Sequence, residues 1–179
     1  DIALAQKWVN EIQQALSENR GLTPPIGWVS PLGCNGSGGL SYPPATNAQG
    51  TNIAYTKPIL LLTDNYTLSA SEFFAATLQD IKRAAVYGVR TDGGGGNVVS
   101  YDFNAAPYSE GSARMTQSII VRHQNVTVPG LPTAPYIENI GIKPDIYANY
   151  QTRTNLLTGG QPFVFGFSSV MSKRMKASQ

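Results

Sequence analysis

The stretch Tyr66–Asp80, YTLSASEFFAATLQD, places Ser69 and Ser71 where an apolar run gives way to a helical pattern. A nucleophilic serine needs an exposed hydroxyl, a base to take its proton, and backbone N–H groups aimed at the developing oxyanion. A strand-to-helix junction supplies the first and the third, because the first turn of a helix leaves its N–H groups unpaired. Either serine could instead be a plain helix cap, since Glu72 follows Ser69 at the capping-box spacing. The two interpretations do not exclude each other.

The elements that must position this junction are predicted from local patterns. The apolar run Ile59–Leu62, bounded by a proline and an aspartate, predicts a buried strand, and a helix over 69–84 leads to a second buried strand over 84–91. Strand–helix–strand with short loops indicates a parallel crossover and an α/β fold. Further predicted elements are a helix over 2–16 that Asp1 would cap, strands over 97–103 and 114–128, a loop closing into a short strand over 137–148, and a C-terminal helix with Pro162 near its first turn.

Composition limits the function classes. The 179 residues suggest one domain, with a long Gly/Pro/Ser-rich loop or insertion over 22–56. A net charge of +2 and the lack of a basic cluster before the C-terminal tail argue against nucleic acid as a partner. One cysteine, Cys34, and one histidine, His123, leave no internal disulfide and no multi-histidine metal site, so we expect no cofactor. No apolar run is long enough to predict a transmembrane helix.

Two separated motifs resemble those of the tail-specific, or C-terminal processing, serine peptidases. The first spans an apolar strand, Ser-Ala-Ser-Glu, a helix with Gln-Asp, a strand ending in glycine and a Thr-x-Gly turn. The second is a closing Glu-x-x-Gly-Ile-x-Pro-Asp. The matching segments are 59–62, 69–72, 75–80, 86–88, 91–93 and 138–145. The resemblance covers roughly Pro58–Asp145 and implies the C-terminal portion of a crotonase/ClpP-like α/β superhelix built from strand–strand–helix units.

The resemblance also assigns roles. The first serine of the motif is the family's nucleophile, which points to Ser69, and the backbone N–H of Ala70 would contribute to the oxyanion hole. The processing branch uses a Ser–Lys dyad, but Gly94 stands at the lysine position. A tricorn-like branch uses Ser, His and Glu, and there the glutamate of the late motif corresponds to Glu138. That branch carries its histidine far upstream of the serine, so we expect His123 to be a solvent-facing strand residue and the base to be missing from these residues.

The expected function is a serine endopeptidase module acting on extended polypeptides through an acyl-enzyme on Ser69. We expect the chain to be a partial peptidase core that needs an upstream histidine, and we expect a missing N-terminal part of the same protein to be the partner that supplies it. An extracytoplasmic location, periplasmic or secreted, follows from the family alone. The alternative is a non-catalytic ligand- or peptide-binding relative of the same fold. An acyl-CoA enzyme of the crotonase type is a third possibility, for which no CoA phosphate site is visible in the sequence.

Overall fold

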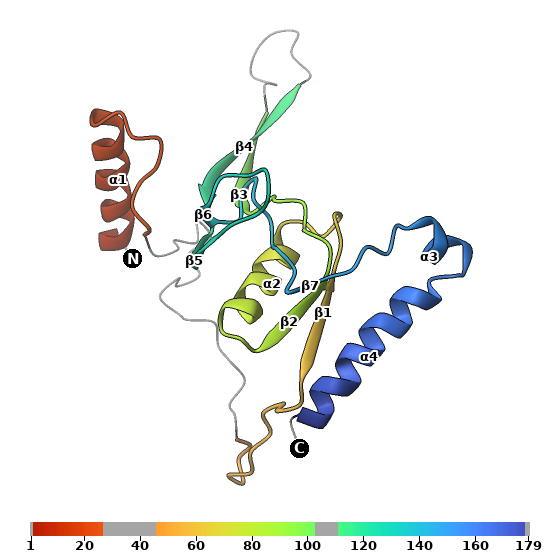
Figure 1. The fold of residues 1–179 in the computed structure, drawn as a ribbon. Coiled ribbons are helices and arrows are strands. Elements are labelled where there is room, and N and C mark those ends of the chain that lie inside the picture. The colour runs from red at the N-terminus through yellow and green to blue at the C-terminus, as the bar shows by residue number, and fades with distance from the viewer. Residues whose placement is uncertain (1, 27–45, 103–110, 178–179) are drawn as a thin grey trace. The chain divides into compact units, whose positions relative to one another are not determined.

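The computed structural model describes residues 2–26, 46–102 and 111–177, which fall into two compact units that meet in the sequence at Tyr55 and Thr56 (Figure 1). The first unit contains helix α1 (Ile2–Ser17), which confirms the predicted first helix, and an isolated bridge between Thr46 and Asn52. The cap at position 1 and residues 27–45 of the long loop lie outside the described residues. The division into a single domain with an insertion stays a prediction.

The second unit is built on a parallel strand–helix–strand crossover. Strand β1 (Ile59–Thr63) leads through helix α2 (Ala70–Asp80) to strand β2 (Ala84–Gly88), and the two strands pair in parallel. Strand β7 (Ile146–Tyr147) joins the other edge of β2, also in parallel, so the sheet has the order β1-β2-β7. The predicted α/β class is confirmed at this level. The short closing strand of the late motif is also confirmed.

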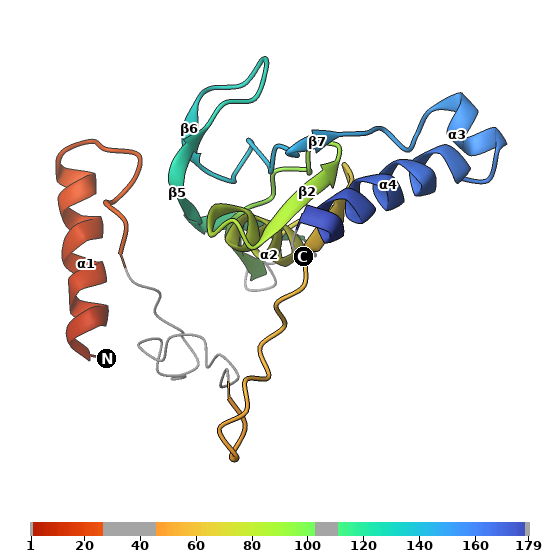
Figure 2. The same ribbon diagram turned by 60° about the horizontal axis from the view of Figure 1, so that its bottom comes forward.

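Two helices cover opposite faces of this sheet (Figures 1 and 2). On one face, Leu61 and Val86 contact the core that α2 completes with its alanines. On the other face lies the C-terminal helix α4 (Gln161–Ala177), which follows the short helix α3 (Arg153–Leu157). There the ring of Tyr87 meets Phe163 edge-on, with 5.4 Å between the ring centroids.

One burial prediction was wrong. Strand β2 is buried along its whole length, but β1 is only partly buried, and Leu62 is 49% exposed. The reason is the position of β1 at the edge of the sheet, where it pairs with β2 alone among the described strands. A short apolar run does not distinguish a central strand from an edge strand.

The remaining strands form two antiparallel pairs. Strand β3 (Gly96–Asp102) pairs with β4 (Ser112–Ile119), and β5 (Val121–Val126) pairs with β6 (Ala134–Tyr136). The single strand predicted over 114–128 is therefore broken at Ile120. There the chain changes partners: the Ile120 N–H donates to the Gly95 carbonyl at 3.0 Å, and its carbonyl accepts from the Ile137 N–H at 3.4 Å.

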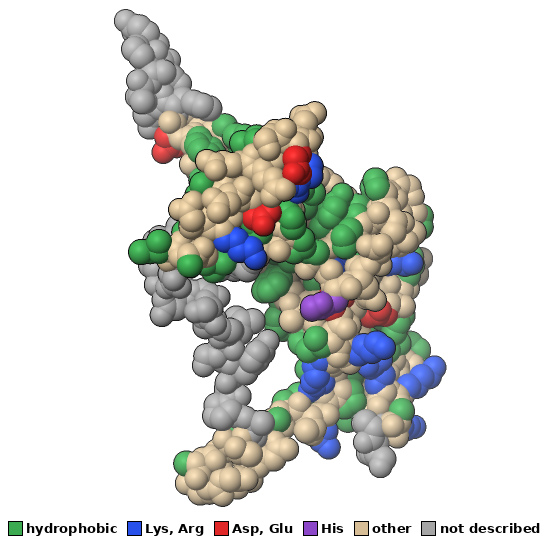
Figure 3. Space-filling model, turned by 90° about the vertical axis from the view of Figure 1, so that its left-hand side faces the viewer, with side chains coloured by type: hydrophobic (Ala, Val, Ile, Leu, Met, Phe, Trp, Pro, Cys, Tyr) green, Lys and Arg blue, Asp and Glu red, His purple; other side chains and the backbone are tan. Residues whose placement is uncertain are grey.

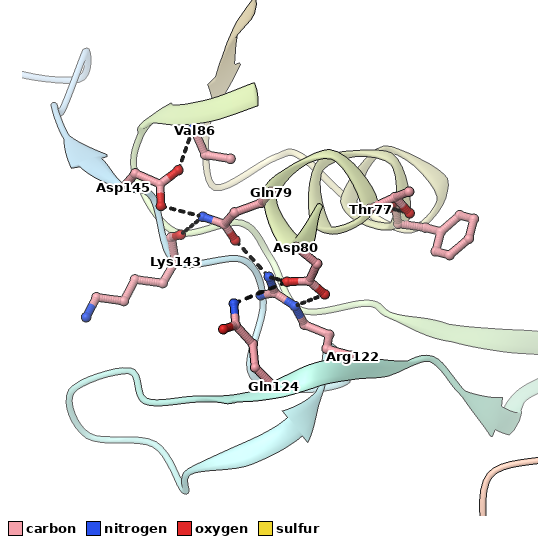
Figure 4. A network of polar contacts seen from close by, with 9 residues as sticks. Thr77, Gln79, Asp80, Val86, Arg122, Gln124, Lys143 and Asp145 are labelled. Atoms are coloured by element: carbon pink, nitrogen blue, oxygen red, sulfur yellow. Dashed lines mark hydrogen bonds and ion pairs between the residues drawn. The ribbon is translucent and has the colours of Figure 1, made fainter. Parts of the chain in front are cut away.

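A buried ion pair fastens the C-terminal end of α2 to β5 (Figure 4). The guanidinium of Arg122 binds the carboxylate of Asp80, and their side chains are 2% and 6% exposed. Arg122 also donates to Gln79 Oε1 at 2.8 Å, and Gln79 Nε2 donates to Asp145 Oδ1 at 3.0 Å. The other oxygen of Asp145 accepts from the Val86 N–H at 2.7 Å. This network therefore joins the helix to β2, to β5 and to the end of the late motif.

We expect Arg122→Ala to lower the free energy of unfolding by about 3–5 kcal/mol, because it leaves the buried carboxylate of Asp80 without its charged partner. Urea denaturation followed by circular dichroism measures this. The matched control is Arg153→Ala, since Arg153 is exposed and its removal should change the free energy by less than about 0.5 kcal/mol. Equal stability of the two variants would contradict the importance assigned to the network.

Candidate functional site

Ser69 occupies a sharp turn at the start of α2. It is the residue immediately before the helix, which begins at Ala70, one residue later than the start of the predicted range 69–84. Its backbone has φ 60° and ψ −121°, in the positive-φ region that residues other than glycine rarely adopt. Such a conformation costs on the order of 1–3 kcal/mol and persists where the surroundings fix it. The turn leaves Ser69 exposed to solvent.

The two serines of the junction differ in their hydrogen bonds. The Ser71 hydroxyl donates to the Leu68 carbonyl at 2.7 Å and accepts from the Leu68 N–H at 3.1 Å, so it is used within the turn. The Ser69 backbone N–H donates to Glu72 Oε2 at 3.0 Å, which is the glutamate half of the predicted capping box. Ala70, as the first helical residue, carries one of the N–H groups that have no acceptor within a helix. The capping interpretation therefore applies to this junction without excluding chemistry at Ser69.

Glu72 has a structural position that the sequence indicated only in part. Its side chain is fully buried, at 0% exposure. Besides the Ser69 N–H, it accepts hydrogen bonds at Oε1 from the Thr91 hydroxyl at 2.5 Å and from the Gly93 N–H at 2.8 Å. The Thr91 hydroxyl in turn accepts from the Ile142 N–H at 2.7 Å. The capping spacing predicted the bond to Ser69, but nothing in the spacing indicated the bonds to the distant turn.

The glycine run Gly93–Gly96 begins at the last residue of the first predicted motif and precedes the second. A Cβ atom at Gly94 would overlap the side chain of Leu68, next to Ser69, and would lie 3.8 Å from Glu72 Oε2. At Gly95 it would lie 3.0 Å from the Glu138 N atom, and at Gly96 it would lie 3.1 Å from Glu138 Oε2. The turn therefore passes close to the Ser69 junction with its first half and close to Glu138 with its second.

Glu138 follows the buried residue Ile137 in the late motif and is itself half-buried. Its Oε1 accepts from the Thr116 hydroxyl of β4 at 3.1 Å. Its Oε2 is buried, and no group among the described residues donates a hydrogen bond to it. A buried carboxylate oxygen without a donor is costly, and an imidazole N–H is a donor of the required kind. This arrangement suits a carboxylate that orients a histidine.

The other candidate groups do not join this site. His123 is exposed on β5, as predicted, and it is the purple side chain in Figure 3. Lys143 is exposed as well, and its carbonyl accepts from Gln79 Nε2 at 3.0 Å. Cys34 lies outside the described residues. A hollow between β1 and α4 is lined by Leu60, Leu62, Phe167, Ser168, Met171 and Ser172, none of them a predicted site residue.

Within the described ranges, no three side chains of His, Cys, Asp or Glu gather into a group that could hold a metal ion. No helix in that part of the chain is both long enough and apolar enough to cross a bilayer.

Comparison with known proteins places the chain among peptidases. The model of peptidase family S41 matches residues 13–148, which is more than half of the chain. An uncharacterized protein of Chlamydia muridarum (strain MoPn / Nigg) is 38% identical over 96 residues, and a protein of Chlamydia trachomatis serovar D is 34% identical over 96 residues. Each alignment covers 52% of this chain and 14% of the relative, so the chain spans a small part of these longer proteins.

The chain is also similar to solved structures. Mature CPAF matches with a TM-score of 0.51 and 29% identity over 66% of this chain and 19% of that chain. Mature CPAF complexed with lactacystin matches with a TM-score of 0.55 over 99% of this chain and 29% of that chain, and at 21% identity this match indicates a shared fold. Because the family model matches more than half of the chain, the chain belongs to peptidase family S41.

Proposed function

We propose that this chain is the part of a serine endopeptidase that carries the nucleophile, and that the nucleophile is Ser69. The observation that carries the proposal is the backbone of Ser69, held at φ 60° directly before a helix and exposed to solvent. Strained non-glycine residues cluster at functional sites, where the surrounding structure fixes them. Membership of a peptidase family makes peptide hydrolysis the chemistry to assign to this residue.

The proposed reaction proceeds through an acyl-enzyme. The Ser69 hydroxyl attacks a peptide carbonyl while an imidazole takes its proton, and the Ala70 N–H donates to the oxyanion. The imidazole then gives the proton to the leaving amine, and water hydrolyses the ester in a second step. Glu138 would orient and stabilise the imidazole through Oε2, to which none of the described residues donates a hydrogen bond. The histidine would come from outside these 179 residues, because His123 lies on β5 next to Arg122, which binds Asp80 at the end of α2 opposite Ser69.

Further properties follow from the family and belong to the same proposal. The sheet β1-β2-β7 with α2 would be the C-terminal portion of a crotonase/ClpP-like superhelix. The substrate would be an extended or unfolded polypeptide, and the compartment would be extracytoplasmic. The 179 residues would act as one partial peptidase core together with the remainder of a longer protein.

A second candidate function has its own support. Gly94 stands where the processing branch has its lysine, and a Cβ at that position would overlap Leu68. Position 94 of the turn beside Ser69 therefore offers no lysine as a base. A relative that binds peptides or another ligand without cleaving them is consistent with this feature.

Covalent labelling of Ser69 tests the proposal against this alternative. We expect a serine-reactive fluorophosphonate, added to the full-length polypeptide that contains this sequence, to form an adduct on Ser69 that peptide mass spectrometry locates. Ser69→Ala should abolish the adduct. Ser71→Ala is the matched control and should keep it, because the Ser71 hydroxyl is bound to Leu68 on the same turn. A natively folded protein that takes up no label would favour the binding function.

A further inference from the structure

We propose that Glu72 is a positioning residue that fixes the turn at Ser69 relative to the loop that carries Glu138. The inference rests on the proposed function of Ser69 and extends it to a residue that does not touch the substrate. Glu72 is fully buried, and its two carboxylate oxygens accept hydrogen bonds from two different parts of the chain. Burying a carboxylate removes it from water at a cost in free energy, so each of its oxygens needs hydrogen-bond donors from the protein.

The first oxygen acts on the strained residue directly. Glu72 Oε2 accepts from the Ser69 N–H at 3.0 Å, and the Ser69 carbonyl accepts from the Glu72 N–H at 2.9 Å. Glu72, three residues further along the chain, thus binds both the backbone N–H and the backbone carbonyl of Ser69. These two hydrogen bonds help to hold Ser69 at its positive φ, since an unfavourable backbone conformation persists only where the surrounding structure fixes it.

The second oxygen connects this turn to the other half of the site. Glu72 Oε1 accepts from the Thr91 hydroxyl and from the Gly93 N–H. Thr91 is 1% exposed, and its hydroxyl oxygen accepts from the Ile142 N–H. The Gly93 carbonyl accepts from the Asn139 N–H at 2.7 Å, one residue after Glu138. Two short paths, through Thr91 and through Gly93, therefore run from the Ser69 N–H to the loop that carries Glu138.

The position of Ser69 relative to Glu138 is consequently set through Glu72. A misplacement of a reacting group by about 1 Å can lower the rate by about 100-fold. Glutamine at position 72 would keep the shape of the side chain but would turn a donor NH₂ toward at least one of the three donors that now meet an acceptor. We expect helix α2 to remain folded, but the turn at Ser69 should no longer be held in a fixed position relative to the loop that carries Glu138.

The test compares Glu72→Gln with Asp80→Asn in the full-length polypeptide. Asp80 is the matched control, because it is a second buried carboxylate on α2 with charged and polar partners, but it lies at the far end of the helix. Per folded molecule, the rate of fluorophosphonate labelling at Ser69 should fall about 10–100-fold in Glu72→Gln. In Asp80→Asn the labelling rate per folded molecule should stay within about two-fold of the parent rate, because this substitution should lower only the free energy of unfolding.

Amide hydrogen exchange supplies a readout that does not depend on activity. We normalise the exchange rates of the Ser69 and Gly93 N–H groups to those of the β2 amides. Compared with the parent protein, these rates should be about ten-fold higher in Glu72→Gln and should not change in Asp80→Asn. If the parent protein takes up no label at Ser69, the proposed function fails, and the exchange rates still decide the role of Glu72. Labelling and exchange in Glu72→Gln equal to those of Asp80→Asn would overturn the inference.

Substitutions at Thr91 test the same connection if Glu72→Gln does not fold. Thr91→Val keeps the volume but removes the hydroxyl that joins Glu72 to Ile142. It should slow labelling in the same direction as Glu72→Gln. Thr91→Ser restores the hydroxyl and should restore the labelling rate. Equal rates for the valine and serine variants would contradict the proposed path.

Discussion

The 179-residue chain by itself is expected to hydrolyse casein no faster than its own Ser69→Ala variant. A serine peptidase that lacks its base loses on the order of four to six decades of rate. The sole histidine, His123, is exposed on β5, and the residue in the turn beside Ser69 is Gly94 rather than lysine. Release of acid-soluble fluorescent peptides from labelled casein measures the rate.

His123→Ala is the control for this expectation, and it should leave the background unchanged. Robust casein hydrolysis by the 179-residue chain that disappears in Ser69→Ala would show that a base is present within it. His123→Ala would then show whether that base is the histidine of β5.

The second large effect concerns Glu138. In the full-length polypeptide, Glu138→Gln is expected to lower kcat by about 10⁴-fold with little change in KM, because removing the carboxylate that orients a catalytic histidine has an effect of this order on kcat. The substitution replaces one carboxylate oxygen by an NH₂ group, so an imidazole N–H could meet a second donor. Steady-state hydrolysis of a quenched-fluorescent peptide gives both constants.

Asp92→Asn is the matched control for charge. Asp92 lies beside Thr91 and Gly93 in the same turn, is exposed, and is held there through its backbone N–H, which donates to the Thr67 carbonyl at 3.1 Å. Removing its charge should change kcat by less than about ten-fold, since exposed charges act weakly through solvent. If Glu138→Gln behaves like Asp92→Asn, Glu138 is a structural carboxylate of the late motif.

The sequence predicted the features that depend on local pattern. The run Ile59–Leu62, the small residues around Ser69 and the helical spacing after it were sufficient to predict the strand–helix–strand unit and the place of the serine. The segment 137–148 was likewise predicted to be a loop that closes into a short strand, and that strand is β7 at Ile146–Tyr147. These signals lie within a few residues of the elements that they specify.

The features that depend on contacts between distant segments could not be predicted in this way. The chain breaks its strand at Ile120 because two partners, Gly95 and Ile137, meet it there. Glu72 is buried because Thr91 and Gly93 supply its donors. Neither position has an unusual local sequence, so only the arrangement of the chain in three dimensions reveals it.

The glycines at 95 and 96 have a consequence for mapping this protein by saturation mutagenesis. A Cβ at Gly95 would overlap Ile137, and one at Gly96 would overlap Thr116 and crowd Glu138 Oε2. A screen scored by peptidase activity alone would therefore rank these two positions with Ser69 and Glu138, although they have no functional group. Each variant therefore needs two scores, the abundance of folded protein and the turnover per folded molecule. Only the two together distinguish a residue that takes part in the chemistry from a glycine that has no room for a side chain.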